Sequence, residues 1–302
     1  MTAADQIIRF YEPLAANPQK TARFCPEYPC VATNWSRGIG DTMALSNLPS
    51  ANKGIYVHSA SPHFKVLKSL FLGYKPVGDA SRIYRVEVLQ GKFRLGNGHF
   101  FQRLQRAFGI EVSLRPQGSL LVTQGSSIRK QIALHLSVGH FANHQKHIHP
   151  RARQLYPEHR ETLQQFVNQN KQFDFVEVGT EFSGLENVTN SCNLDLHQTL
   201  AILSNSEYFI GMNSGVMHLA AALGIKSVII LNFPSARELY LPVLKDINLP
   251  DLDWLYPQNV HLHEDDEGEL VKSLSLENLS KAINGELYPF WTEDFLSLVE
   301  HG

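Results

Sequence analysis

The sequence predicts an α/β protein with two domains, each built on a parallel sheet. Short apolar runs alternate with amphipathic segments along much of the chain, which is typical of a parallel sheet covered by helices. The chain has 302 residues, 43% of them hydrophobic and 19% charged, which is enough for two cores of about 150 residues each. A stretch rich in Pro, Gly, Ser and Gln, residues 115–131, separates two series of these elements. We therefore expect domains at 1–122 and 123–302.

In the first domain, each expected strand is followed by a tight turn or a loop. The helix after the first strand should end before Pro49, since a proline cannot continue it. The second helix places Phe64, Leu67, Leu70 and Phe71 on one face. The expected strands are residues 29–36, 54–59 and 83–88, and the expected helices are residues 41–48, 62–74 and 100–110.

In the second domain the alternation is clearer. Residues 208–233 read as one strand-helix-strand unit, whose helix is stopped by Gly224. The expected strands are residues 131–137, 173–179, 208–212 and 227–233, and the expected helices are residues 153–170, 195–205, 216–223 and 286–299. The last helix carries large apolar residues and is expected to pack in this domain or back onto the first one.

Composition excludes several classes of protein. The 27 Lys and Arg residues nearly balance the 29 Asp and Glu residues, so no positive field indicates a nucleic-acid partner. The 3 cysteines, Cys25, Cys30 and Cys192, are too few for a disulfide framework, although a bridge between the first two is a less favoured alternative. The sequence shows neither a signal peptide nor a run of about 18 apolar residues. We expect a cytoplasmic protein with at most peripheral contact to a membrane.

A polar turn, Asn213-Ser214-Gly215, ends an expected strand and opens an expected helix. The first backbone N–H groups of such a helix, its dipole and the Ser214 hydroxyl would converge on one point that suits a phosphate. His218 falls in the first turn and could add a donor. The alternative is a simple helix cap, with His218 packed at a domain edge.

Residues 135–150 combine one lysine with five histidines: His135, His140, His144, His147 and His149. Their spacing in an irregular loop lacks the helical HExxH pattern and has no clustered carboxylate, so a metal site is the less favoured interpretation. Lys146 is better interpreted as a positive charge that faces the same phosphate as the polar turn Asn213-Ser214-Gly215.

A second turn, Gly38-Ile39-Gly40-Asp41, follows the first expected strand. Its glycines permit a close approach by a ligand or by backbone, and Asp41 places a carboxylate at the start of a helix. The alternative is that Asp41 only complements the helix dipole.

Together these loops resemble the ADP-heptose-dependent heptosyltransferases and their relatives, glycosyltransferase family nine, which have the GT-B architecture. The resemblance is carried, in the family's order, by GIGDTMALSNLP (38–49), IALHLSVGHFANHQKHIHP (132–150), NLDLHQTLAILSNSEYFIG (193–211) and NSGVMHLAAALG (213–224). Asn213 stands where the family usually has Asp. The amide keeps the hydrogen-bonding capacity and lacks the charge.

The resemblance implies two Rossmann-like domains whose parallel sheets face each other across a cleft, with the acceptor bound by the first and the nucleotide sugar by the second. It makes Asp41 the general base. It assigns contact with the donor diphosphate to Lys146, Asn213, Ser214, Gly215, Val216 and His218. Further candidates for substrate contact are Gly38, Gly40, His140, Arg237 and Glu238.

The activity implied is a metal-independent, inverting transfer of a heptose or hexose-like unit. The donor would be a nucleoside-diphosphate sugar and the acceptor a glycan, glycolipid or lipopolysaccharide-type molecule, with no cofactor. A GT-B nucleotide-sugar epimerase and a catalytically silent nucleotide-sugar-binding protein are the alternatives. The oligomeric state stays open.

Overall fold

The computed structural model describes residues 30–34, 38–46, 48, 54–77, 82–85, 130–137, 155–231, 256, 259–263 and 272–287. The chain divides into two compact units, residues 1–121 and 122–302. Each unit is described by itself below. Within the described residues, no helix has both the length and the apolar character needed to span a membrane.

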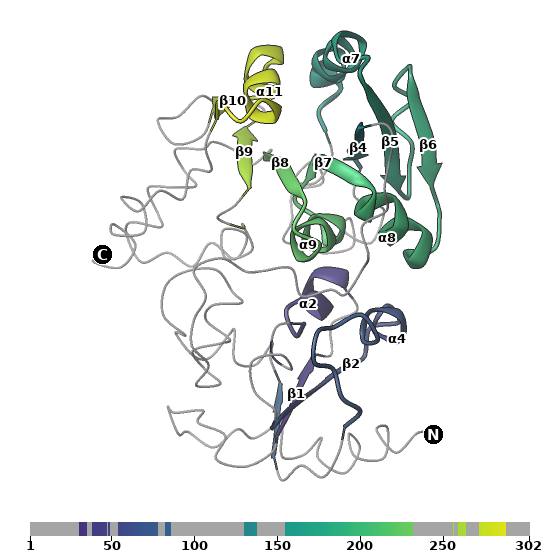
Figure 1. Ribbon diagram of the computed structural model, residues 1–302, viewed down its shortest axis with the longest axis vertical. Coiled ribbons are helices and arrows are strands. Elements are labelled where there is room, and N and C mark those ends of the chain that lie inside the picture. The colour runs from purple at the N-terminus through teal and green to yellow at the C-terminus, as the bar shows by residue number, and fades with distance from the viewer. Residues whose placement is uncertain are drawn as a thin grey trace, which may run out of the picture. The chain divides into compact units, whose positions relative to one another are not determined.

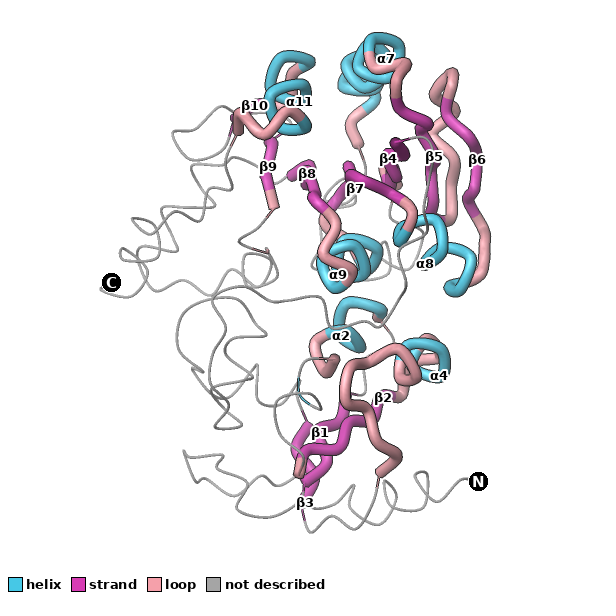
Figure 2. The backbone as a smooth tube through the Cα atoms, viewed as in Figure 1, coloured by secondary structure: helices cyan, strands magenta, loops and turns pink. Residues whose placement is uncertain are grey.

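The N-terminal unit contains a parallel sheet in the order β2-β1-β3. Its strands are β1 (Cys30–Asn34), β2 (Ile55–Ser59) and β3 (Arg82–Arg85), and the three strands expected from the sequence are thereby confirmed. In the central strand β1, Cys30, Val31 and Ala32 are buried. Figure 2 shows these strands lying side by side.

The helices of this unit are shorter than predicted: α2 covers Ile39–Met43 and α4 covers Phe64–Leu67. After α2 the backbone forms a turn in which the N–H of Ser46 donates to the Met43 carbonyl, three residues earlier, at 2.9 Å. The Ser46 hydroxyl donates to the same carbonyl at 2.6 Å and so competes with continuation of the helix. The predicted helix at 100–110 lies outside the described residues.

The C-terminal unit contains a larger parallel sheet in the order β10-β9-β8-β7-β4-β5-β6. Its strands are β4 (Lys130–His135), β5 (Phe173–Gly179), β6 (Val188–Cys192), β7 (Ser206–Met212), β8 (Lys226–Leu231), β9 (Val260–His263) and β10 (Lys272–Ser273). The predictions for β4, β5, β7 and β8 are confirmed, whereas β6, β9 and β10 were not predicted.

Helices cover both faces of this sheet. The helices are η2 (Pro157–His159), α7 (Arg160–Gln169), α8 (Leu196–Ser204), α9 (Gly215–Ala222) and α11 (Leu276–Ile283). Figure 1 shows α8 and α9 on one face and α7 and α11 on the other. Those predicted at 153–170, 195–205 and 216–223 are confirmed with shorter bounds. Residues 288–299 of the predicted last helix lie outside the described part of the chain.

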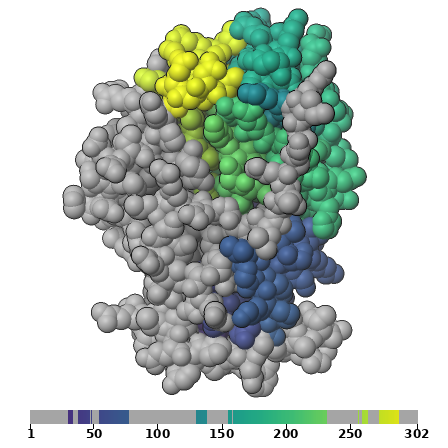
Figure 3. Space-filling model, in the orientation of Figure 1, coloured from purple at the N-terminus to yellow at the C-terminus, as the bar shows by residue number. Residues whose placement is uncertain are grey.

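The main apolar core lies between the sheet and the pair α7 and α11. Alternate residues of the central strands point to this face, among them Leu134, Ile210 and Ile230, each no more than 1% exposed. Phe166 of α7 and Leu279 of α11 pack onto them and are fully buried. The two helices also contact each other, and their surfaces adjoin in the space-filling view (Figure 3).

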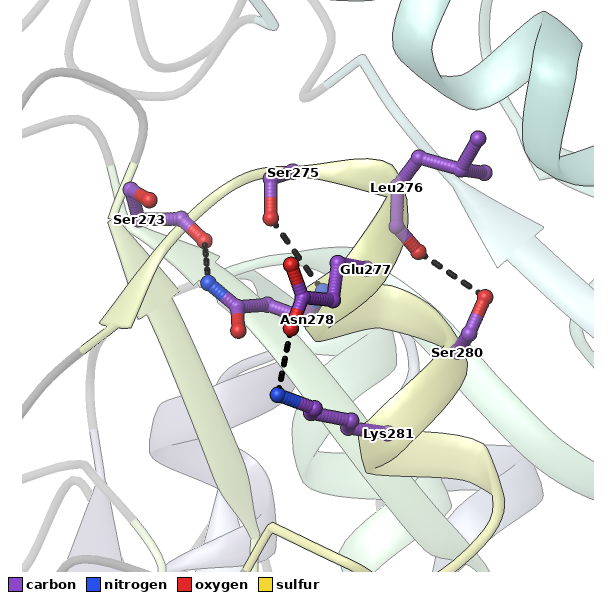
Figure 4. A network of polar contacts seen from close by, with 7 residues as sticks. All are labelled: Ser273, Ser275, Leu276, Glu277, Asn278, Ser280 and Lys281. Carbon is purple, nitrogen blue, oxygen red and sulfur yellow. Dashed lines mark hydrogen bonds and ion pairs between the residues drawn. The ribbon is translucent and has the colours of Figure 1, made fainter.

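Local hydrogen bonds fix the start of α11, the helix that the sequence analysis missed (Figure 4). The Ser275 hydroxyl accepts from the N–H of Asn278 at 3.1 Å, and the Asn278 amide donates to the Ser273 carbonyl at 2.9 Å. An ion pair between Glu277 and Lys281 adds to the first turns. The cap therefore ties α11 directly to β10.

In both sheets the chain adds strands first on one side of a starting strand and then on its other side. In the larger sheet the chain runs outward from β4 through β5 and β6, and then crosses to β7 on the other side of β4. In the smaller sheet β2 and β3 lie on opposite sides of β1. Parallel sheets bind ligands at the carboxyl ends of strands that flank such a switch point.

The capping box of α8, the helix that leads into β7, offers a test of local stability. Asp195 accepts from the N–H of Gln198 at 2.8 Å, and the Gln198 side chain accepts from the N–H of Asp195 at 3.1 Å. Replacement Asp195→Ala should lower the free energy of unfolding by about 1 kcal/mol, measured by urea titration. Asp195→Asn keeps an acceptor at the cap and serves as the control. An unchanged free energy of unfolding in Asp195→Ala would contradict the prediction.

Candidate functional site

The polar turn after β7 lies at the switch point of the larger sheet. Ser214 is the N-cap of α9: its backbone is extended, and its hydroxyl oxygen accepts from the N–H of Met217 at 3.4 Å. Within the described part of the chain, no group accepts from the N–H groups of Gly215 and Val216. These N–H groups and the positive end of the helix dipole can therefore meet an anion.

His135 is the last residue of β4 and lies within the strand predicted at 131–137. Its Nδ1 lies 3.3 Å from the Ser214 hydroxyl oxygen, and both side chains are buried. Burial lowers the pKa of His135 to about 4, so the ring is neutral at neutral pH. Among the predicted candidates Ser214 thus gains a partner that spacing alone did not reveal.

His218 is held by an aromatic residue from a distant segment. Its Nδ1 lies 2.8 Å from the hydroxyl of Tyr256, and the rings meet edge to face with centroids 5.4 Å apart. Burial raises the pKa of Tyr256 well above its usual value, so the phenol is neutral. With Nδ1 engaged in this way, a bond from His218 to a ligand would have to come from Nε2.

The second predicted turn lies at the carboxyl end of β1 in the N-terminal unit. Gly38 precedes α2, and Asp41 falls in the first turn of that helix with its side chain half-buried. The hydroxyl of the next residue, Thr42, donates to the Gly38 carbonyl at 3.0 Å and lies 3.3 Å from the Ser59 hydroxyl at the end of β2. Thr42 therefore links the turn to the end of β2.

A buried carboxylate, which the sequence analysis did not select, shapes the loop after β5. Glu177 accepts from the Ser183 hydroxyl at 2.6 Å and from the Ser183 N–H. Burial raises the pKa of Glu177, and the bonds from Ser183 oppose that rise. Farther along this loop Glu181 accepts from the Ser137 hydroxyl at 3.4 Å, which links the loop to the end of β4.

The predicted site residues fall into three groups. One group, Asn213, Ser214, Gly215, Val216 and His218, forms the continuous turn at the start of α9. Gly38, Gly40 and Asp41 form the turn of the N-terminal unit. The residues that lie outside the described ranges are His140, Lys146, Arg237 and Glu238.

A search for metal ligands covers only the residues that the structure describes, and there no cluster of three or more His, Cys, Asp or Glu side chains could hold an ion. Most of the histidine-rich loop, residues 138–150, lies outside those ranges. The absence of a metal therefore stays a prediction.

Comparisons with known proteins bear on the family and on the fold. Residues 170–238 match the family model described as glycosyltransferase family 9 (heptosyltransferase). The sequence has no significant match among curated proteins. The E. coli heptosyltransferase WaaC with ADP is 12% identical, with a TM-score of 0.56 over 85% of this chain and 100% of that one.

Two further solved structures are similar. E. coli ADP-heptose lps heptosyltransferase II is 14% identical, with a TM-score of 0.54 over 85% of this chain and 99% of that one. A family 9 glycosyl transferase from Veillonella parvula is 11% identical, with a TM-score of 0.53 over 88% and 99%. At such identities the structural likeness establishes the fold, which is GT-B.

The family match and the fold together indicate a glycosyltransferase of the GT-B class, as expected from the sequence motifs. Residues 170–238 are similar to the family 9 heptosyltransferases, and the Veillonella parvula protein of that family has a similar fold. The family match spans the turn at the start of α9, the described region in which the candidate residues are most concentrated.

Two buried histidines should make stability depend on pH. Burial lowers the pKa of His135 to about 4 and that of His261 to about 3, from an ordinary value of 6.5. Below pH 6.5 these two histidines therefore bind protons in the unfolded chain but stay neutral in the folded chain. The free energy of unfolding should fall as pH drops from 6.5 towards 4, by about 1.4 kcal/mol for each unit of pKa difference. Urea titrations should show a shallower fall for His135→Phe, and identical slopes would contradict the prediction.

The contact between His218 and Tyr256 should contribute measurably to stability. Tyr256→Phe keeps the ring and removes a buried hydrogen bond, which should cost about 1–2 kcal/mol in urea titrations. Tyr208→Phe is the matched control in the same unit, because Tyr208 is only half-buried and contacts Lys226 through its ring. Equal effects of the two replacements would argue against a special role for the Tyr256 hydroxyl.

Proposed function

We propose that this protein is an inverting glycosyltransferase that moves a heptose or hexose-like unit from a nucleoside-diphosphate sugar to a glycan or glycolipid acceptor of the lipopolysaccharide type. The C-terminal unit binds the donor and the N-terminal unit the acceptor. The reaction uses no metal ion and no cofactor. The similarity to an ADP-heptose lps heptosyltransferase supports this choice of donor and acceptor.

The start of α9 carries the proposal. It combines two N–H groups that have no acceptor among the described residues, a helix dipole and a buried serine hydroxyl at the switch point of a parallel sheet. Such a constellation suits the diphosphate of a nucleotide. A matched GT-B structure is that of a heptosyltransferase with ADP, which supports a nucleoside diphosphate as the ligand here.

The proposed reaction is a single displacement at the anomeric carbon C1 of the donor. Asp41 accepts the proton of the acceptor hydroxyl while the hydroxyl oxygen forms a bond to C1. The bond between C1 and the diphosphate oxygen breaks on the opposite face, and the electron pair leaves with the nucleoside diphosphate. One such attack inverts the anomeric centre.

The leaving group acquires negative charge as its bond to C1 breaks. The N–H groups of Gly215 and Val216 are fixed at the helix start and need no reorganisation to meet this charge. Lys146 and the Nε2 of His218 would supply further donors. Asn213 is buried beside this group as a neutral amide, so it adds no repulsion to the diphosphate.

The decisive experiment is a thermal-shift screen of ADP-, UDP-, GDP- and CMP-sugars, followed by product analysis for each sugar nucleotide that binds. Free nucleoside diphosphate together with a glycosylated acceptor of inverted configuration is the expected result. An isomerised sugar nucleotide would identify an epimerase instead. Binding without consumption of any donor, across a panel of acceptor glycans, would identify a silent nucleotide-sugar-binding protein.

Replacement of Asp41 tests the proposed base. Asp41→Asn should lower kcat for transfer by at least about a hundredfold and leave the affinity for the donor nearly unchanged, because the amide cannot accept the proton. Glu161→Gln, on the exposed side of α7, is the matched loss of a carboxylate elsewhere and should leave kcat unchanged. Near-full activity of Asp41→Asn would overturn the role of Asp41.

A further inference from the structure

The ends of three strands converge on His135. In the register of β4 and β7, His135 pairs with Gly211, where an added Cβ would lie only 2.7 Å from the His135 carbonyl oxygen. At the end of β5, a Cβ on Gly179 would lie 3.0 Å from Cδ2 of the imidazole and 3.2 Å from Nε2. Gly179 thus leaves room for the imidazole, which packs against the end of β5, and Gly211 allows β7 to approach the backbone of β4 closely.

The fixed ring faces the hydroxyl of Ser214. A serine oxygen has two acceptor sites and one hydrogen to donate. The Ser214 oxygen accepts from the N–H of Met217 at 3.4 Å, which fills one acceptor site. Its second partner is Nδ1 of His135, at 3.3 Å. Whether the Ser214 hydroxyl donates to His135 or accepts from it depends on which ring nitrogen of His135 carries the proton.

We propose that His135 is a positioning residue for the donor: its Nδ1–H donates to the Ser214 oxygen, and the serine hydrogen is thereby directed to an oxygen of the bound diphosphate. In this tautomer both acceptor sites of the serine are filled, and its only remaining bond is a donation. The opposite tautomer would consume the serine hydrogen within the protein. The inference rests on the proposed function, since it assigns the partner of the donor phosphate.

Burial makes the arrangement independent of pH near neutrality. His135 and Ser214 are each 4% exposed, and a pKa of about 4 keeps the imidazole uncharged. A neutral ring with a fixed orientation donates through one nitrogen only. His135 thus acts on the ligand through Ser214 and not by its own charge.

A double-mutant cycle on the affinity for ADP tests the inference. Ser214→Ala and His135→Phe should each raise the Kd by up to about tenfold, the value of one hydrogen bond. The double variant should bind no worse than Ser214→Ala alone, because His135 acts only through that serine. His135→Asn, whose amide can donate from nearly the position of Nδ1, should restore most of the affinity.

The matched control is His261→Phe. His261 is also a buried histidine, and it lies on the same face of the sheet, since β9 pairs it with Ile229, which pairs with Gly211. This replacement should change stability without changing the Kd for ADP. An effect on ADP binding equal to that of His135→Phe would overturn the inference, because general loosening of the sheet would then explain both.

The remaining outcomes are distinguishable. If the wild-type protein bound neither ADP nor any other nucleoside diphosphate, the proposed function would fail and the inference with it. If Ser214→Ala weakened binding while the effect of His135→Phe was absent or simply additive, only the inference would fail. Nitrogen-15 NMR of the wild-type complex with ADP gives a readout that does not depend on folding of a variant: protonation at Nδ1 of His135 is expected, and protonation at Nε2 alone would overturn the inference.

Discussion

The parallel pairing of β4 with β7 is the constraint on which the described structure of the C-terminal unit depends. These strands are separated in the sequence by β5 and β6, yet they lie next to each other at the centre of the sheet. Their pairing places the last residue of β4 beside the first turn of α9. It also gives α8 and α9 one face of the sheet and α7 and α11 the other. The pairing thus brings together the two parts of the candidate donor site, His135 at the end of β4 and the turn at the start of α9.

Much of the fold can be predicted from local pattern, and the misses have physical causes. The apolar runs of β4, β5, β7 and β8 are buried on both faces and are therefore recognisable as strands. By contrast, β6 has the sequence VTNSC and lies exposed at the edge of the sheet, so it lacks an apolar signal. Helix α2 was predicted too long because apolar spacing does not detect the Ser46 hydroxyl, which competes for the Met43 carbonyl.

The candidate site was predictable in part. The residues at the start of α9 and around Asp41 form contiguous motifs, and motifs of this kind can be read without knowledge of the fold. The partners of these residues come from elsewhere: Tyr256 lies 38 positions from His218, and His135 lies 79 positions from Ser214. Nothing in the neighbourhood of either partner indicates such a contact. The motifs therefore contain the candidate contact residues, whereas the contacts that hold these residues come from distant segments and cannot be predicted from local pattern.

The separation of His135 from Ser214 also bears on how the protein is made. Contacts between residues so far apart in the chain carry a loop-closure cost and form late in folding, which slows the folding of parallel sheets. The contact between His135 and Ser214 therefore requires that β4 and β7 have both been made and paired. A nucleotide that binds only the completed turn draws the folding equilibrium forward by mass action.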